Sequence, residues 1–143
     1  MIGNLKNIEK YSNGYFSDLH LKKYISKGLE IYYKYFVGKY VYKLRKNPIL
    51  SIIESHSTAE SYLIYTEFSE YLNENMRKKF SNSLENTFIK LWDDKENYFY
   101  NNIKVLMGIK IYDKTDMIRW SDSWMLYAIS KFIMLKKGQN SEI

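Results

Sequence analysis

The segment 119–128, which reads Arg-Trp-Ser-Asp-Ser-Trp-Met-Leu-Tyr-Ala, carries more chemistry than the start of a helix requires. Ser121 or Asp122 alone could cap a helix N-terminus by accepting hydrogen bonds from its backbone. The segment adds an arginine and two indoles, and a buried indole needs a hydrogen-bond acceptor for its N–H group. Two interpretations of this cluster stay open: a packed seam between helices, or a wall of rings that stacks on a sugar or a base.

A second candidate lies at Glu54-Ser55-His56-Ser57, where a carboxylate and an imidazole precede a predicted helix. A neutral imidazole could act as a general base or hydrogen-bond a ligand hydroxyl. The alternative is a histidine that only ties down the loop and the helix start. The next residues, Ser57 to Glu60, have the spacing of a capping box, which accounts for Glu60 without any catalytic role.

Neither a metal site nor a cofactor site is expected. The acidic turn at residues 93–97 departs from a calcium loop, because Lys95 and Tyr98 stand where a ligand side chain and a glycine are needed. The chain has no cysteine, and His20 and His56 are 36 residues apart, which disfavours zinc. Carboxylates for glycoside cleavage could come from Glu54, Asp93, Asp94 and Asp122, but the sequence does not set their separation.

The elements that would position these residues are mainly helices. Apolar spacing predicts helices over residues 18–36, 57–72, 76–92 and 121–136, with Gly138 ending the last one. Residues 37–42 alternate like an extended segment, and Pro48 lies in an irregular connection. Alternation within 98–111 indicates a small hairpin. The last helix is apolar over a wide arc, which predicts burial on more than one side.

These elements predict an all-α fold, with about four main helices arranged as antiparallel α/α hairpins and a small β-hairpin as an embellishment. We expect an irregular lead over residues 1–16, a single helical domain over 17–138 and a tail over 139–143. The chain of 143 residues is long enough for one self-sufficient core.

Composition and charge narrow the classes of partner. No apolar window reaches the roughly 18 residues of a membrane span, and the first residues lack the apolar core of a secretory signal. A cytoplasmic location is therefore expected. Residues 1–50 carry ten lysines and arginines against three acidic residues, a net charge of +7, while residues 51–143 carry −1. The basic third could bind phosphates or anionic lipid, or it could be the solvated lysine face of an amphipathic helix.

Several short motifs stand in an order that resembles a bacterial family of α/α-toroid proteins. They are Phe-Val-Gly-Lys-Tyr-Val-Tyr at 36–42, Ser-His-Ser-Thr-Ala-Glu at 55–60, Asn-Tyr-Phe-Tyr at 97–100 and Arg-Trp-Ser-Asp-Ser-Trp-Met at 119–125. The family resembles six-hairpin glycosidases and is often encoded in surface-polysaccharide gene clusters. The resemblance covers about residues 18–136. It departs at Glu54, where the family has aspartate, and at 121–122, where the family has Gly-Gln.

The resemblance implies the C-terminal portion of a toroid, truncated or split, because a complete ring needs about twelve helices of ordinary length. It implies a residual carbohydrate-facing wall without autonomous catalysis. Trp120 would stack on a sugar ring, Arg119 would pair with a uronate or phosphate, and Glu54 or His56 would contact hydroxyls. Tyr100 and Asp122 would belong to the same wall.

A second hypothesis from another class is a small basic helical module that uses residues 18–46. It would bind a protein partner, nucleic acid or an anionic membrane surface, with nucleic acid the less favoured partner. Under the first hypothesis the partner is a glycan, and an incomplete ring would leave apolar helix faces uncovered. Self-association, or pairing with a second chain that supplies the missing helices, is then expected.

Overall fold

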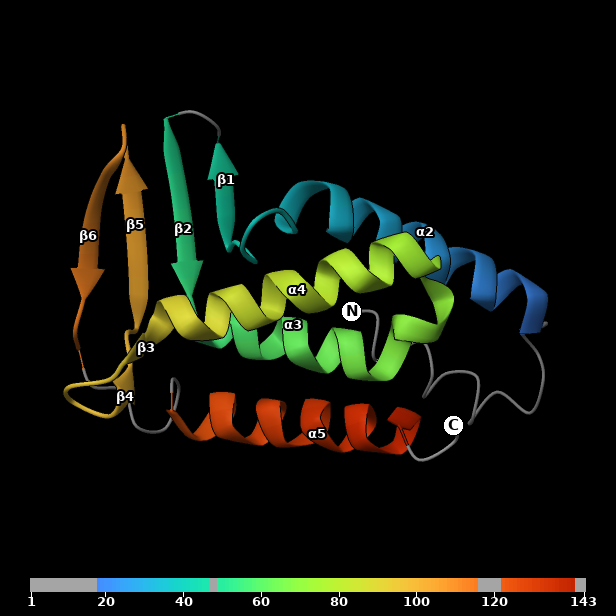
Figure 1. The fold of residues 1–143 in the computed structure, drawn as a ribbon. Helices are drawn as coiled ribbons and strands as arrows, with labels where there is room; N and C mark the ends of the chain where they lie inside the picture. The colour runs from blue at the N-terminus through green and yellow to red at the C-terminus, as the bar shows by residue number, and fades with distance from the viewer. Residues whose placement is uncertain (1–17, 47–48, 116–121, 141–143) are drawn as a thin grey trace.

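The computed structural model describes residues 18–46, 49–115 and 122–140. Within these ranges, four α-helices lie beside a four-stranded antiparallel sheet (Figure 1). The helices are α2 (Asp18–Phe36), α3 (Ser55–Phe68), α4 (Glu74–Leu91) and α5 (Ser123–Asn140), and a 3₁₀ turn, η1 (Ser69–Tyr71), follows α3. The sheet has the order β1-β2-β5-β6, with β1 (Leu44–Lys46), β2 (Leu50–Glu54), β5 (Asn102–Leu106) and β6 (Ile109–Asp113). A two-stranded ribbon joins β3 (Trp92–Asp93) to β4 (Tyr98–Phe99).

The described architecture is α+β, so the expected all-α arrangement of α/α hairpins is wrong. The predicted hairpin exists as β5–β6, but β5 also pairs with β2 over its whole length, from Leu50 opposite Leu106 to Glu54 opposite Asn102. The sequence predicts an irregular connection around Pro48 and no strand after it, whereas residues 50–54 form β2. The periodicity of a short apolar run does not by itself reveal a strand, and the strand that β2 pairs with lies about fifty residues away in the sequence.

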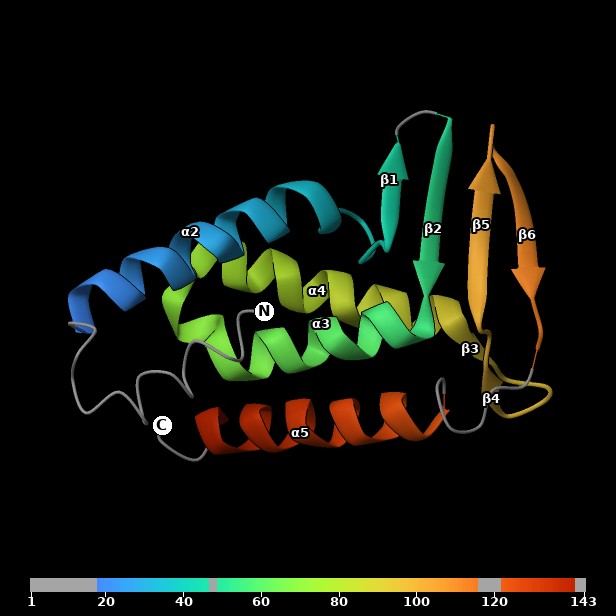
Figure 2. The same ribbon diagram turned by 180° about the vertical axis from the view of Figure 1, so that it is seen from behind.

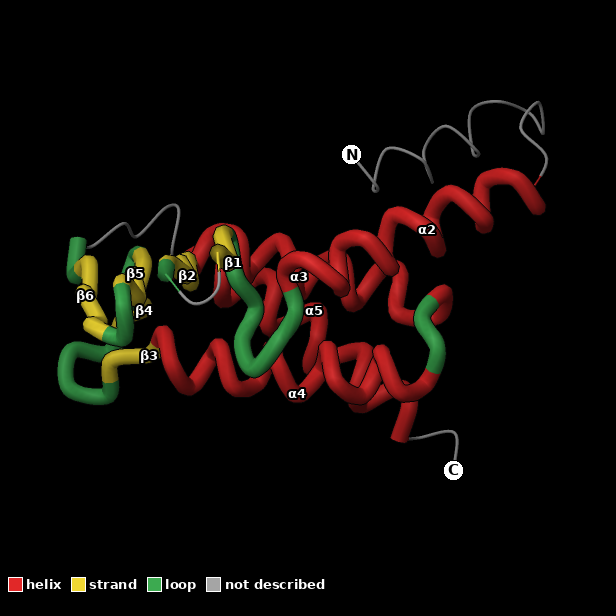
Figure 3. Tube along the Cα trace, turned by 90° about the horizontal axis from the view of Figure 1, so that it is seen from above, coloured by secondary structure: helices red, strands yellow, loops and turns green. Residues whose placement is uncertain are grey.

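The sheet stands across one end of the helices, as the view from above shows (Figure 3). Only its end nearest the helices is buried, where Ile53 is 2% and Ile103 is 0% exposed. The far end carries the tight β5–β6 turn, in which Met107 and Gly108 adopt positive φ angles of 48° and 86°. A left-handed turn of this kind matches the twist of the two strands, which fixes their register.

The helix boundaries differ from the predicted ones by a few residues, and three of the differences concern how a helix begins or ends. Helix α3 begins at Ser55 with Glu54 as its N-cap, so Ser57 lies inside the helix and the capping-box prediction is wrong. Asn73, which was not singled out, caps α4 through its side chain, which accepts a hydrogen bond from the Met76 N–H group. Helix α5 continues through Gly138 to Asn140, so Gly138 does not end the helix, and it does not adopt the positive φ angle typical of a glycine that follows a helix C-terminus.

Helix α3 is the centre of the helical layer, between α2 and α5 in the views from the front and from behind (Figures 1 and 2). It packs most extensively on α5 and less extensively on α4. The shared core contains Phe80 of α4, whose ring centroid lies 5.4 Å from that of Tyr65 and 6.0 Å from that of Tyr32. One buried cluster therefore joins α2, α3 and α4, and through Met125, Ala128 and Phe132 it extends to α5.

Helix α5 is buried on one side only, which corrects the expectation of burial on more than one side. Met125 and Ala128 are fully buried against the rest of the core. The opposite flanks expose large apolar side chains, namely Leu126, Tyr127, Ile133 and Met134. Among the described residues, no helix combines the length and the apolar character needed to cross a bilayer.

Candidate functional site

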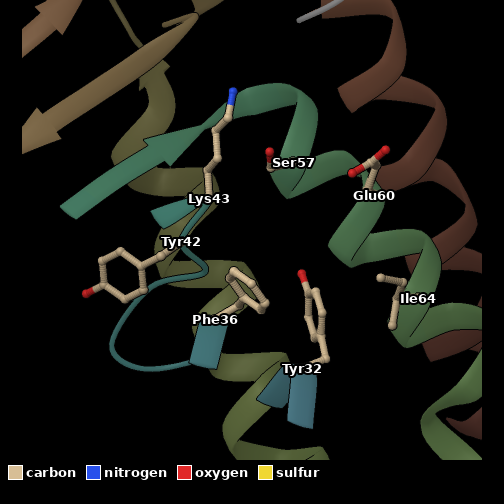
Figure 4. Close-up of a pocket in the computed structure, with 7 residues that line it drawn as sticks. All are labelled: Tyr32, Phe36, Tyr42, Lys43, Ser57, Glu60 and Ile64. Atoms are coloured by element: carbon tan, nitrogen blue, oxygen red, sulfur yellow. The ribbon is translucent and has the colours of Figure 1, made fainter. Parts of the chain in front are cut away.

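A cleft of about 210 Å³ opens between α2, α3 and the segment that leads into β1 (Figure 4). Its lining combines rings and aliphatic groups with a hydroxyl, an ammonium and a carboxylate. Figure 4 shows the α2 side chains facing those of α3, with Tyr42 at the end far from Ile64. The lining residues are Tyr32, Phe36, Tyr42, Lys43, Ser57, Glu60 and Ile64.

Helix α4 fixes the segment that delivers Tyr42 and Lys43 to this cleft. Residues 37–41 form a small loop closed by a bridge between Val37 and Val41. The hydroxyl of Thr87 accepts a hydrogen bond from the Val41 N–H group at 2.8 Å, and the Ser83 hydroxyl donates to the Gly38 carbonyl. These contacts tie both ends of the loop to α4, and Val37 and Val41 are buried, while Lys39 at the tip of the loop stays exposed.

Glu54 lies beside the cleft and binds two of its lining residues. Its Oε1 accepts a hydrogen bond from Lys43 Nζ at 2.5 Å, and its Oε2 accepts one from the Ser57 hydroxyl at 2.6 Å. Partial burial by itself would raise the pKa of Glu54, but the hydrogen bonds from Lys43 and Ser57 and the charge of Lys43 outweigh it and lower the pKa. Glu54 is therefore an ionised carboxylate that orients Lys43 and Ser57.

His56 lies in the first turn of α3 and does not line the cleft. Its Nε2 is 3.6 Å from Oε1 of Glu60, which lines the cleft. The imidazole also stacks on the Trp124 indole with ring centroids 6.1 Å apart, and Trp124 stacks in turn on Tyr127 at 5.7 Å. The structure thus places His56 at the head of a row of rings that starts on α3 and continues along α5.

Two other predicted site residues have structural partners elsewhere. The Tyr100 hydroxyl donates a 2.6 Å hydrogen bond to Asp93 Oδ2, which raises the pKa of Tyr100 to about 12 and lowers the pKa of Asp93. Asp122 accepts a hydrogen bond from the backbone N–H group of Phe99 at 2.9 Å. Both side chains stabilise the β3–β4 ribbon and its link to α5, and neither lines the cleft.

Of the six predicted site residues, the structure places only Glu54 at the edge of the cleft, through its bonds to Lys43 and Ser57, while His56 approaches the lining residue Glu60 without lining the cleft itself. Arg119 and Trp120 lie outside the described residues. The sequence singled out neither Tyr32 nor Lys43 for the site, although the Lys-Tyr-Val-Tyr stretch at 39–42 was noted as a motif. Tyr32 is partly buried against the core, and its hydroxyl forms a 2.5 Å hydrogen bond with Ser61 Oγ.

Among the residues that the structure describes, no group of three or more histidines and carboxylates is arranged to hold a metal ion. Asp93 in particular uses its oxygens on the turn: Oδ1 accepts from the N–H groups of Lys95 and Glu96, and Oδ2 faces Tyr100 and Lys114. This arrangement is an Asx turn that closes the β3–β4 ribbon.

Asp113 gives the sheet an acid-sensitive contact. Its carboxylate accepts hydrogen bonds from the Thr115 hydroxyl and backbone and from the side-chain amides of Asn101 and Asn102, and these lower its pKa to about 2. A pKa below the unfolded value means that ionised Asp113 stabilises the fold above about pH 4 and that this contribution is lost as the pH falls toward 2.

We therefore expect Asp113→Asn to flatten the decline of the melting temperature between about pH 4 and pH 2. The measurement is thermal unfolding followed by circular dichroism at half-unit pH intervals from 6 to 2. Asp94→Asn, at an exposed position of the β3–β4 turn, is the matched control and should keep the wild-type profile. Acid profiles of equal slope for Asp113→Asn and wild type would contradict the assignment.

Comparison with known proteins finds no match to this chain among protein families, curated proteins or solved structures. The resemblance to α/α-toroid proteins therefore stays a prediction.

Proposed function

We propose that this chain binds a carbohydrate in the cleft between α2 and α3 and does not turn it over by itself. The observation that carries the proposal is the hydrogen-bonded set Lys43–Glu54–Ser57 at the edge of a ring-lined cleft. Sugars present apolar C–H faces and a rim of hydroxyls. A mixed lining with a few oriented polar groups is suited to such a ligand.

Each part of the lining has a role in this proposal. Phe36 and Tyr42 supply ring surface for a sugar face. Glu60, whose side chain is 58% exposed, can accept hydrogen bonds from two hydroxyls, and Lys43, oriented by Glu54, can donate one. Hydrogen bonds to charged groups are stronger than those between neutral groups, so a few of them suffice for selectivity.

The same geometry argues for binding without hydrolysis. Glycoside cleavage requires a carboxylic acid whose pKa is raised so that it can protonate the leaving oxygen. The pKa of Glu54 is shifted the opposite way by Lys43 and Ser57, so this residue stays ionised and orients its neighbours.

Calorimetric titration with neutral, N-acetylated and uronic-acid oligosaccharides tests the proposal. We expect binding by at least one class and a loss of about ten-fold in affinity for Glu60→Gln, because a charge-assisted hydrogen bond is weakened while the shape is kept. Glu96→Gln, in the exposed β3–β4 turn, is the control and should bind as wild type does. An absence of heat with every class, or unchanged affinity for Glu60→Gln, would refute it.

A second candidate is the basic interaction module on α2. The described part of this helix exposes Lys22, Lys23 and Lys27, and it also exposes Tyr24, Ile31 and Tyr35. Cations beside exposed rings suit an anionic surface. Binding of the wild-type chain to anionic vesicles or acidic polymers should fall steeply as salt rises. Replacing the three lysines by glutamine should abolish this binding and leave oligosaccharide titrations unchanged.

A further inference from the structure

The side of the molecule away from α2 carries a groove between α4 and α5, and α3 forms its floor. Both flanking helices pack on α3, and α5 makes far fewer contacts with α4 than with α3. The groove therefore stays open along the two antiparallel helices. Its two halves, of about 360 Å³ and about 410 Å³, differ sharply in chemistry.

The half near the C-terminal end of α4 is apolar apart from Glu85. Ile89 on one wall is 73% exposed and Ile133 on the other is 46% exposed, although both are large aliphatic side chains. The floor is rigid, because the Tyr62 hydroxyl donates a 3.0 Å hydrogen bond to the Leu84 carbonyl and its ring packs edge-on against Phe132. The lining residues of this half are Tyr62, Glu85, Phe88, Ile89, Ile129, Phe132 and Ile133.

The half near the N-terminal end of α4 is basic. Arg77, Lys78 and Lys136 line it, against the single carboxylate of Glu74. Arg77 is fixed in place, because its guanidinium donates to the carbonyls of Ser69 and Leu72 at the turn that follows α3. The positive charge at this end is therefore built into the helix junction and does not depend on one flexible side chain.

We propose that this groove docks an amphipathic α-helix of another protein, with its apolar stripe against Ile89 and Ile133 and an acidic C-terminal end against Arg77, Lys78 and Lys136. An apolar stripe at i, i+3, i+4 and i+7 fits a groove between two helices. The C-terminal end of a helix also carries partial negative charge, so the basic half favours that orientation.

Charge complementarity decides between this occupant and a second copy of the chain. Besides α4, which forms one wall of the groove, two described helices expose large apolar side chains, and both are rich in lysine: α2 carries Lys23, Lys27 and Lys34, and α5 carries Lys131, Lys136 and Lys137. Either helix from a second copy would place lysines against the basic half of the groove. Like charges brought together in this way oppose association.

The test uses two fluorescein-labelled 18-residue helical peptides with the same leucine stripe, one with glutamates and one with lysines in the last two turns. Fluorescence anisotropy at low salt should give at least about ten-fold tighter binding for the acidic peptide, with a difference that shrinks as salt rises. Ile89→Ser combined with Ile133→Ser should weaken the acidic peptide by about ten-fold or more. Ile109→Ser, on the exposed β6 strand, is the matched control.

A second variant, Lys78→Glu with Lys136→Glu, should remove the preference for the acidic peptide while both peptides keep some affinity through the leucine stripe. Equal binding of the two peptides to the wild-type chain would overturn the proposal, as would full affinity in the Ile89 and Ile133 variant. Light scattering that shows a dimer, converted to a monomer by Ile89→Ser, would overturn it in favour of a second copy.

Discussion

Phe80→Ala should lower the free energy of unfolding by about 3–5 kcal/mol, the range typical of a buried phenylalanine replaced by alanine. Phe80 is 1% exposed, and its ring contacts Tyr32 of α2 and Tyr65 of α3. The substitution therefore opens a cavity where three helices meet, and those helices cannot all close on it. Whole domains have a free energy of unfolding of only about 5–15 kcal/mol, so this single change would remove a large part of the stability of the chain.

Urea denaturation followed by circular dichroism measures this effect as a shift of the midpoint at constant slope. Ile89→Ala is the matched control on the same helix, because Ile89 is 73% exposed and should change stability by no more than about 0.5 kcal/mol. A Phe80→Ala variant as stable as the control would show that α2, α3 and α4 do not share one core.

Ile103→Ala should destabilise the whole chain by about 2–5 kcal/mol, and this result separates the observed fold from the predicted one. Ile103 on β5 is fully buried, and it pairs with the buried Ile53 on β2. Because β2 leads directly into α3, a cavity at this position loosens the attachment of the sheet to the helical core. If 102–113 were a detached hairpin, the same change would leave global unfolding unaltered.

The measurement combines urea denaturation with hydrogen exchange of the amides in α3. Both should report weaker protection in Ile103→Ala than in wild type. Ile111→Ala on the neighbouring strand β6 is the control, because Ile111 is 52% exposed and its loss leaves no cavity. Loss of exchange protection confined to β5 and β6, with α3 unchanged, would contradict an integral sheet.

The two proposed sites lie on opposite sides of α3 and can be separated by experiment. Ser57 and Glu60 of α3 line the cleft, whereas Tyr62 and Tyr65 form the floor of the groove. Variants at Ile89 and Ile133 should therefore leave oligosaccharide titrations unchanged, and Glu60→Gln should leave peptide binding unchanged. One chain could then hold a glycan and a protein partner at the same time.

The sequence by itself determined the positions of the four described helices to within a few residues. A distinct apolar stripe marks α2 and α4, whereas α3 and α5 are more apolar overall and have no single sharp apolar face. Phe80, Leu84 and Leu91 lie buried on one face of α4, as their spacing predicts. The sequence also predicted a hairpin within residues 98–111. It indicated Glu54 and His56 as candidate site residues, because a carboxylate and an imidazole next to a predicted helix can be recognised from residue type and position alone.

Tertiary structure decided the rest. The pairing of β2 with β5 joins segments about fifty residues apart, and periodicity within a short strand carries no information about a distant partner. The cleft could not be predicted for the same reason. Tyr32, Lys43 and Ser57 come from three different segments, and the loop that delivers Lys43 is held by the hydrogen bond between Val41 and Thr87 of α4. Local spacing records which face of a helix is apolar, but only packing decides which of those faces is covered, as the exposed flanks of α5 demonstrate.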